Sequence, residues 1–261
     1  MIRFSVNLNK VALVRNTRDL GIPNVLRAAQ LCLEAGADGI TVHPRPDRRH
    51  ILPGDVRELA PLVRELGAEL NVEGYPSDDF IALVLEVRAH QCTLVPDGPE
   101  QRTSDHGWDV DDQHALLTRA IGALNAAGVR TSLFMDAATA ADADRIALAR
   151  AVGAARVELY TEPYAKAFGT AREAELRASV SATAQRAHNA GLGVNAGHDL
   201  NLSNLQPLVD ASPQIQEVSI GHAFIADSLE LGYTAAVKAY LDVLAGRMRT
   251  VRFTARASPN S

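Results

Sequence analysis

Short runs of β-branched and aliphatic residues alternate along the chain with longer stretches of helical periodicity. Eight of the short runs read as strands, and they cover Ile2–Leu8, Gly39–His43, Leu70–Val72, Gln91–Val95, Arg130–Phe134, Arg156–Leu159, Gly193–Asn195 and Glu217–Ile220. Between them, apolar residues recur at the three- and four-residue spacing of amphipathic helices. These helical stretches include Pro23–Ala35, Asp55–Leu66, Ser77–Arg88, Asp111–Ala127, Thr139–Val152 and Thr170–Ala190. The pattern predicts an α/β fold in which strands and helices take turns.

Residues typical of helix ends support this division. Pro23 stands where the first turn of a helix is expected, and Ser77 precedes two acids, a common helix start. Glycines follow several helical stretches just before the next predicted strand, where they would cap a helix C-terminus. They are Gly36, Gly67, Gly128 and Gly191.

Eight strands, each followed by a helical segment within about 250 residues, fit a (β/α)8 TIM barrel. A doubly wound open sheet shares the alternation, but the presence of an eighth unit favours the barrel. One more helix, around Gly232–Ala245, lies beyond the eighth unit, and the polar loop Asp97–Asp109 after the fourth strand is a candidate lid. We therefore expect a single barrel domain over residues 1–246 with an extra C-terminal helix. Residues 247–261 contain four arginines and no acid, and we interpret them as a flexible basic tail.

Composition narrows the class of function. The chain is 47% hydrophobic with a formal net charge of -5, as expected for a soluble globular protein and unlike a general nucleic-acid or anionic-membrane binder. The strand pattern begins at Ile2, which leaves no room for a signal peptide, and no apolar run approaches a membrane span. Cys32 and Cys92 form no CxxC pair, so a thiolate metal site is not expected. We expect a cytoplasmic protein that acts on small molecules.

Polar side chains gather where the predicted strands end. In a barrel these ends meet at one mouth, where the active site lies. Six of the eight strands deliver such residues, namely Asn7 and Asn9, His43 with Arg45, Glu73, Glu158, His198 and the pair Gly221-His222. Any one of them alone reads as a solvated or capping residue. Three histidines and two glutamates around one mouth, in a chain with only eight histidines, indicate a site instead.

Basic residues also cluster at this mouth. The segment from His43 to His50 holds three arginines after the second strand, and Arg15 and Arg18 follow the first. A solvated basic loop is the plain alternative, but guanidinium groups suit phosphate oxygens. Gly197-His198 and Gly221-His222 each lead a glycine towards a predicted helix start, where free backbone N–H groups favour a phosphate. The sequence therefore predicts anionic, phosphorylated substrates.

Three other functions compete with this interpretation. A metal site is not expected, because the mouth shows no close His-x-His or Asp-x-His pair. A phosphosugar lyase or aldolase would need a lysine inside the barrel, and only Lys10 is placed to serve, since Lys166 and Lys238 fall in loop or helix positions. A non-catalytic phosphate-ligand-binding barrel would need the arginines but not the four acid–base groups.

Several stretches of the chain resemble the pyridoxine 5'-phosphate synthase family. They are Val6–Asn9, Leu13–Arg18, Ala35–His50, Leu94–Pro96, Val194–His198 and Ile220–Ala223. The resemblance runs from about Phe4 to Leu244, and the stretch ending at His50 is highly specific. It implies a barrel that condenses 3-amino-2-oxopropyl phosphate with 1-deoxy-D-xylulose 5-phosphate to give pyridoxine 5'-phosphate, phosphate and water. It also implies a homo-oligomer, with an octamer as one candidate assembly, and no cofactor or metal.

The same resemblance implies a role for each residue of the mouth. His43 and Glu73 match proton acceptors, His198 matches the proton donor, and Glu158 matches a residue that stabilises charged intermediates. The aminoketone phosphate site is matched by Asn7, Arg18, Asp199, Gly221 and His222. The deoxyxylulose phosphate site is matched by Asn9, Lys10, Arg45, His50 and Thr103.

The chain departs from the family pattern at three places. Asn9-Lys10 replaces an Asp-His pair, prolines flank Arg45, and Asp199 stands where a glycine follows the donor histidine. The first change bears on how the second phosphate is held. The last places a carboxylate beside a phosphate site, so we expect that carboxylate to point away from it.

Overall fold

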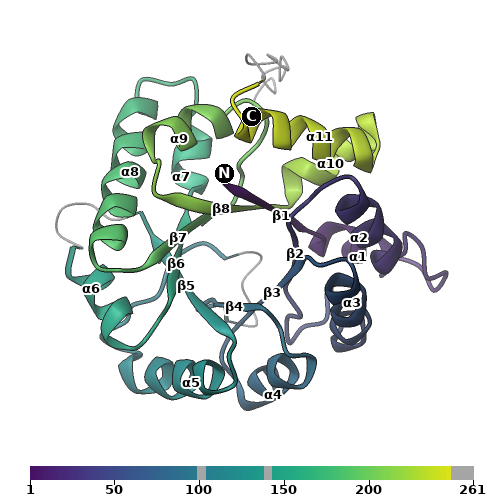
Figure 1. The fold of residues 1–261 in the computed structure, drawn as a ribbon, viewed down its shortest axis with the longest axis horizontal. Coiled ribbons are helices and arrows are strands. Elements are labelled where there is room, and N and C mark those ends of the chain that lie inside the picture. The colour runs from purple at the N-terminus through teal and green to yellow at the C-terminus, as the bar shows by residue number, and fades with distance from the viewer. Residues whose placement is uncertain (99–103, 138–142, 248–261) are drawn as a thin grey trace.

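In a computed structural model, eight parallel strands close into a barrel in sequence order, with helices around the outside (Figure 1). The strands are β1 (Arg3–Asn7), β2 (Gly39–Val42), β3 (Glu69–Gly74), β4 (Gln91–Leu94), β5 (Arg130–Asp136), β6 (Arg156–Tyr160), β7 (Gly193–Gly197) and β8 (Ile215–Ile220). The structure describes residues 1–98, 104–137 and 143–247. The predicted (β/α)8 barrel is confirmed, and each predicted strand corresponds to one of the eight.

The helices include four that sequence periodicity did not predict. The helices are α1 (Asn9–Arg15), α2 (Val25–Glu34), α3 (Pro53–Glu65), α4 (Asp78–Val87), α5 (His114–Ala126), α6 (Ala143–Ala151), α7 (Glu162–Ala167), α8 (Glu173–Asn189), α9 (Leu205–Ala211), α10 (His222–Leu231) and α11 (Tyr233–Leu244). Of these, α1, α7 and α9 have six or seven residues, too few for a periodic pattern to show. The fourth, α10, follows the strand β8 after Gly221, and only Gly232 separates it from α11.

Most of the predicted helix ends are confirmed. The Ser77 hydroxyl caps α4 by accepting a hydrogen bond of 3.3 Å from the backbone N–H of Phe80. The four cap glycines all have positive φ, which lets the chain leave each helix in a left-handed turn. Pro23 does not lie in the first turn of α2, because Asn24 is the N-cap and accepts from the N–H of Arg27 at 2.8 Å.

The hydrophobic core lies between the barrel wall and the helices. Along β1, for example, Phe4 and Val6 are fully buried on the outward face, while the intervening Ser5 points into the barrel. This alternation is the two-residue period of a strand, so each strand gives one face to the core and the other to the barrel interior.

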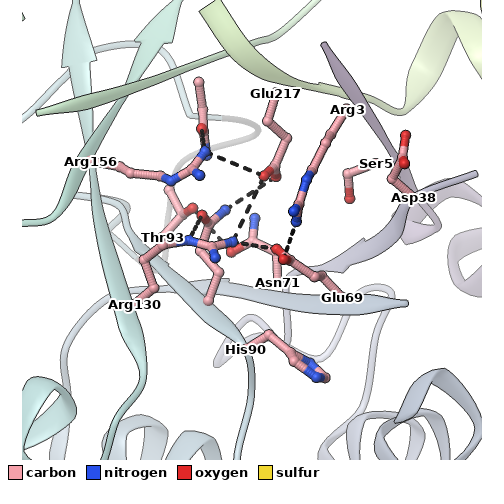
Figure 2. Close-up of polar contacts among 12 residues, drawn as sticks. Arg3, Ser5, Asp38, Glu69, Asn71, His90, Thr93, Arg130, Arg156 and Glu217 are labelled. Atoms are coloured by element: carbon pink, nitrogen blue, oxygen red, sulfur yellow. Dashed lines mark hydrogen bonds and ion pairs between the residues drawn. The ribbon is translucent and has the colours of Figure 1, made fainter. Parts of the chain in front are cut away.

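The barrel interior is polar, where aliphatic side chains are usual. Near the N-terminal ends of the strands lies an ionic cluster, which Figure 2 shows, made by Arg3, Glu69, Arg130, Arg156 and Glu217. Further along, uncharged groups bond to one another, as between the Ser5 and Thr41 hydroxyls at 2.7 Å. The C-terminal ends carry the candidate catalytic groups. Along the barrel axis, the interior therefore holds ion pairs near the N-terminal strand ends, neutral hydrogen bonds further along, and the candidate catalytic groups at the mouth.

The last two helices pack against the outer face of the barrel at β1. Tyr240 of α11 stacks on Phe4 of β1 with ring centroids 5.2 Å apart, and Phe224 of α10 meets both rings at 5.9 Å. The Tyr240 hydroxyl donates to Asp227 at 2.6 Å, so its polar end is satisfied. The predicted extra helix is thus part of the core. No helix within the described ranges is long and apolar enough to cross a membrane.

The three-ring contact predicts a stability effect. Phe224→Ala should lower the free energy of unfolding by about 3–5 kcal/mol, because it removes a fully buried ring and leaves a cavity beside Phe4 and Tyr240. Urea unfolding followed by circular dichroism measures this. Leu229→Ala, on the same helix but 85% exposed, is the matched control and should change stability by less than about 0.5 kcal/mol. Equal losses in the two variants would contradict the packing described here.

Candidate active site

Two asparagines tie the first three strands together at the mouth. The Asn7 side chain donates to Glu73 Oε2 at 3.3 Å and accepts from the backbone N–H of Asn9 at 3.0 Å. The Asn9 side chain accepts in turn from the backbone N–H of His43 at 2.9 Å. The structure therefore brings Asn7, Asn9, His43 and Glu73 together, and both asparagines act as positioning groups.

Gly221 leaves room for Asn7. A Cβ atom at position 221 would lie 3.2 Å from three side-chain atoms of Asn7, tighter than ordinary contact. Because Gly221 is also the N-cap of α10, the start of that helix can approach the end of β1. The predicted Gly-His helix start is confirmed here.

The second Gly-His pair behaves differently. His198 is not followed directly by a helix, since α9 begins only at Leu205, so the predicted helix start after β7 is wrong. Instead, His198 and Asp199 have φ values of 86° and 60°, a left-handed backbone that is costly for residues other than glycine. The Thr161 hydroxyl holds this turn by sharing its one proton between the carbonyl oxygens of Gly197 and His198, at 2.6 and 2.7 Å.

Two carboxyl groups share the deeper part of the mouth. Glu158 is buried and accepts from the Thr93 hydroxyl at 3.3 Å. Burial, with the charge of Glu217, raises the pKa of Glu158 to about 8. Burial, followed by the charge of Glu158, raises the pKa of Glu73 well above its ordinary value. Both carboxyls therefore retain a proton at higher pH than an exposed glutamate does.

The two histidines after β2 are buried in their neutral form. Burial, with His50 and Arg45 adding to it, lowers the pKa of His43 well below its ordinary value. Burial and the charge of Arg45 lower the pKa of His50 to about 4. The His50 ring accepts from the backbone N–H of Ile51 through Nδ1 at 2.9 Å. At neutral pH His43 can therefore accept a proton.

The third histidine lies against a polar group from β6 and α7. The Tyr160 ring meets the His198 ring edge to face with centroids 5.0 Å apart. Among the described residues, one group of potential metal ligands exists, in which atoms of Glu162, His198 and Asp199 lie within 4.8 Å of one another. The Glu162 carboxylate already accepts hydrogen bonds from the Tyr160 hydroxyl and from Lys166, the latter at 2.6 Å. The bonds of the Glu162 carboxylate within the protein therefore explain why these three side chains lie together.

Two of the arginines that the sequence places at the mouth, Arg45 and Arg15, are bound to acids. Arg45 is buried, forms an ion pair with Asp97, and donates to the carbonyl of Gly98 at 3.1 Å. Arg15 forms two hydrogen bonds with Asp55 at the start of α3, so its predicted place among the cations of the rim is wrong. It fixes the loop before α3. The rim is thus less positively charged than the sequence suggested.

The remaining candidates lie at the edge of the mouth or beyond the described ranges. Lys10 is half-buried in the first turn of α1, and its charge contributes to the low pKa of His50. Arg18 is exposed in the turn after α1, and His222 is exposed at the first position of α10. Thr103 lies outside the described residues.

Three buried partners were not predicted from the sequence. Asp97 holds Arg45, Thr161 holds the backbone of His198, and Glu217 lies beneath Glu158. The loop after β4 was predicted as a lid, but residues 99–103 lie outside the described ranges. The part of this loop that follows residue 103 is anchored by Trp108, which is buried and donates to the carbonyl of Leu94 at 2.8 Å. Asp97 and Thr161 follow the ends of β4 and β6, which was the only sequence signal available for them, whereas Glu217 lies within β8.

Comparison with known proteins places this site in a family. A solved structure of tryptophan synthase from M. tuberculosis superimposes with a TM-score of 0.63 at 13% identity, over 95% of this chain and 94% of that one, which supports the barrel fold alone. The pyridoxine 5'-phosphate synthase of Albidiferax ferrireducens is 55% identical over 249 residues, 93% of this chain and 97% of the relative. That of Bacteroides fragilis is 50% identical over 244 residues, 94% of this chain and 100% of the relative. The model of the family described as pyridoxal phosphate biosynthesis protein PdxJ matches residues 4–246, and the chain belongs to this family.

Proposed function

We propose that this chain is a pyridoxine 5'-phosphate synthase, which condenses 3-amino-2-oxopropyl phosphate with 1-deoxy-D-xylulose 5-phosphate. The products are pyridoxine 5'-phosphate, inorganic phosphate and water. The observation that carries the proposal is the convergence at one barrel mouth of two carboxyls with raised pKa, the buried Glu158 and the half-buried Glu73, and a neutral buried histidine, in a chain of this family. Ring closure consists of imine formation, dehydration and phosphate elimination, and each of these steps moves a proton.

We assign a role to each of the four groups. His43 is neutral and takes a proton from the substrate. Glu73 shares its surroundings with Glu158, and like charges so close cannot both ionise easily, so one of the two keeps a proton. We assign that proton to Glu158 and the role of proton acceptor to Glu73. A protonated Glu158 can donate a hydrogen bond to negative charge that develops on an intermediate. His198, fixed by the turn after β7, serves as the proton donor.

The two phosphates occupy opposite sides of the mouth. The side between β7, β8 and β1 offers the N-terminus of α10, to which Gly221 and His222 belong, together with Asn7. We assign it to the aminoketone phosphate, with Arg18 and Asp199 at its edge. The side after β1 and β2 offers Asn9, Lys10, Arg45 and His50, which we assign to the deoxyxylulose phosphate together with Thr103.

Two alternatives fit less well. An aldolase would use Lys10 as the Schiff-base nucleophile, but that lysine lies in the first turn of α1, at the edge and not inside the barrel. A non-catalytic binding barrel has no use for buried carboxyls with raised pKa, whose burial lowers stability without adding affinity for an anion.

The remaining features of the protein follow the same proposal. We infer one barrel domain over residues 1–246, with residues 247–261 as a basic tail, most of which lies outside the described residues. Its small-molecule partners are the two phosphorylated substrates, and no nucleic acid or membrane is involved. We infer a cytoplasmic homo-oligomer, with an octamer as one candidate.

Incubation of the purified protein with both substrates should yield pyridoxine 5'-phosphate, identified by chromatography and mass spectrometry. Glu73→Gln and His198→Gln should each lower kcat by about 10²–10⁴-fold, the usual contribution of a positioned acid or base. Glu175→Gln and His188→Gln make the same changes on exposed positions of α8 and should leave kcat unchanged. Absence of product from the wild type would refute the proposed function, and a normal kcat in either site variant would remove that residue from the mechanism.

The assignment of the two phosphates predicts a difference between two arginines. Arg18→Ala should mainly raise the KM for the aminoketone phosphate, and Arg45→Ala mainly that for deoxyxylulose phosphate. Each lost charge-assisted contact should cost about 1.5–3 kcal/mol, or ~10–150-fold in KM. Arg57→Ala, which removes an exposed arginine of α3, is the control and should change neither KM. Equal increases for both substrates in Arg45→Ala would contradict the assignment.

Lys10 should act as a phosphate-binding cation. Lys10→Arg keeps the charge and should retain much of the activity, whereas Lys10→Met should raise the KM for deoxyxylulose phosphate about tenfold or more. Steady-state kinetics with the second substrate saturating separates the two variants. If Lys10→Arg were as inactive as Lys10→Met, and borohydride trapped a substrate adduct on the wild type, the aldolase interpretation would replace this one.

A further inference from the structure

Glu217 is a buried carboxylate that the proposed reaction does not use. It lies on β8 and is 5% exposed, among the arginines near the N-terminal ends of the strands (Figure 2). The Gln91 side chain donates to it at 3.2 Å, and it lies 3.7 Å from Arg156 Nη1 and 4.0 Å from Arg130 Nη2. Burial is the largest influence on Glu217 and raises its pKa, whereas the two guanidinium groups and the amide donor act in the opposite direction and favour its ionised form.

The strand register places Glu217 close to Glu158. Asn195 on β7 is the register partner of Glu158 on β6 on one side and of Glu217 on β8 on the other. The side-chain Oδ1 of Asn195 accepts from Arg156 Nη1 at 2.7 Å, and the same nitrogen forms the ion pair with Glu217. The two glutamates therefore face the same interior across a single strand.

In the described part of the chain, no cation is paired with Glu158. It belongs to a chain of uncharged, hydrogen-bonded interior side chains, which are Thr93, Asn71, Thr41 and Ser5. In the described part of the chain, the ionisable groups of the strands and their ends around this region include Arg3, His43, Arg45, Glu69, Glu73, Asp97, Arg130, Asp136, Arg156, Tyr160, His198 and Glu217. Arg3, Arg130 and Arg156 bind Glu69 and Glu217 at the far end, and Arg45 binds Asp97. Glu158 thus lies between two carboxyls, Glu73 above it and Glu217 below.

We propose that Glu217 is a positioning residue for Glu158, whose fixed charge keeps the Glu158 carboxyl protonated so that it can donate a hydrogen bond to the substrate. This rests on the proposed function, because it assumes that Glu158 meets a developing negative charge. Burial is the largest cause of the raised pKa of Glu158, and the charge of Glu217 is the next. Glu217 lies further from the mouth than Glu158 does. It therefore acts through Glu158 and does not contact the substrate.

The test follows the protonation of Glu158 directly. The infrared absorption of the protonated carboxyl, assigned by its loss in Glu158→Gln, is titrated with pH in the protein without substrate. Glu217→Gln removes a like charge, so the midpoint should move to lower pH by about 0.5–1.5 units. The alkaline fall of kcat should move in the same direction, because the protonated form is the active one.

Two further variants separate electrostatics from structural damage. Glu69→Gln removes a carboxylate from the same ionic cluster and also leaves arginines without a partner, but Glu69 lies at the partly exposed end. It should destabilise the protein similarly and leave both midpoints unchanged. Arg156→Gln removes the cation that offsets the Glu217 charge, so it should move both midpoints to higher pH. Glu217→Asp keeps the charge and should restore most of the wild-type midpoint.

The outcomes distinguish the two proposals. Opposite shifts in Glu217→Gln and Arg156→Gln, with none in Glu69→Gln, support the role of Glu217. An unchanged infrared midpoint in a folded Glu217→Gln protein overturns it, as does a downward shift in Arg156→Gln. If Glu217→Gln does not fold, the direction of the Arg156→Gln shift decides. Because the infrared titration needs no turnover, failure to form pyridoxine 5'-phosphate would refute the function without affecting this result.

Discussion

A closed parallel barrel must fill its interior with side chains from its own strands, and in this chain those side chains are mostly polar. Buried polar groups are tolerated only when they are paired, so the interior is organised as ion pairs at one end and neutral hydrogen bonds in the middle. The cations Arg3, Arg130 and Arg156 are bound to Glu69 and Glu217 near the N-terminal ends of the strands. Among the described residues, no cation is paired with Glu73 or Glu158 near the mouth. Burial, together with the charges of neighbouring carboxylates, therefore raises the pKa values of both.

The mouth is shaped by acids that bind its arginines. Arg45 and Asp97 are both buried and form an ion pair, and a buried pair is expensive to break by removing one partner. The pair therefore fixes the segment after β2 against the loop after β4, while Arg15 and Asp55 fix the other end of that segment to α3. A sugar phosphate that binds Arg45 must compete with Asp97 for its donors. The arginine is thereby held in place before the substrate arrives, at the cost of part of its affinity.

Sequence reasoning was most successful where the signal was local or repeated. The strands, six of the helices around them and the final helix follow from periodicity and from cap residues such as Ser77, and the strand ends identified the mouth. The partners of the site residues depend on closure of the barrel, which the sequence alone does not display. Glu217 is far from Glu158 in sequence, and Asp97 from Arg45, so neither pairing has a local signal. The error on Arg15 has the same origin, because an arginine after a strand is read as a ligand-binding group until its acid is seen.

The turn after β7 shows how the protein fixes one side chain, that of His198, which we propose as the proton donor. His198 and Asp199 both adopt a left-handed backbone, which costs of order 1–3 kcal/mol for a non-glycine residue and is maintained only when the surroundings impose it. Thr161 imposes it by sharing its hydroxyl proton between two consecutive carbonyls, and the Asn204 side chain donates to the carbonyl of Asp199 at 3.2 Å. A relaxed turn would save that energy but would rotate the imidazole away from Tyr160. The strain is therefore located where the orientation of a proton donor matters most, and it is offset by the buried ring contacts and hydrogen bonds elsewhere in the barrel.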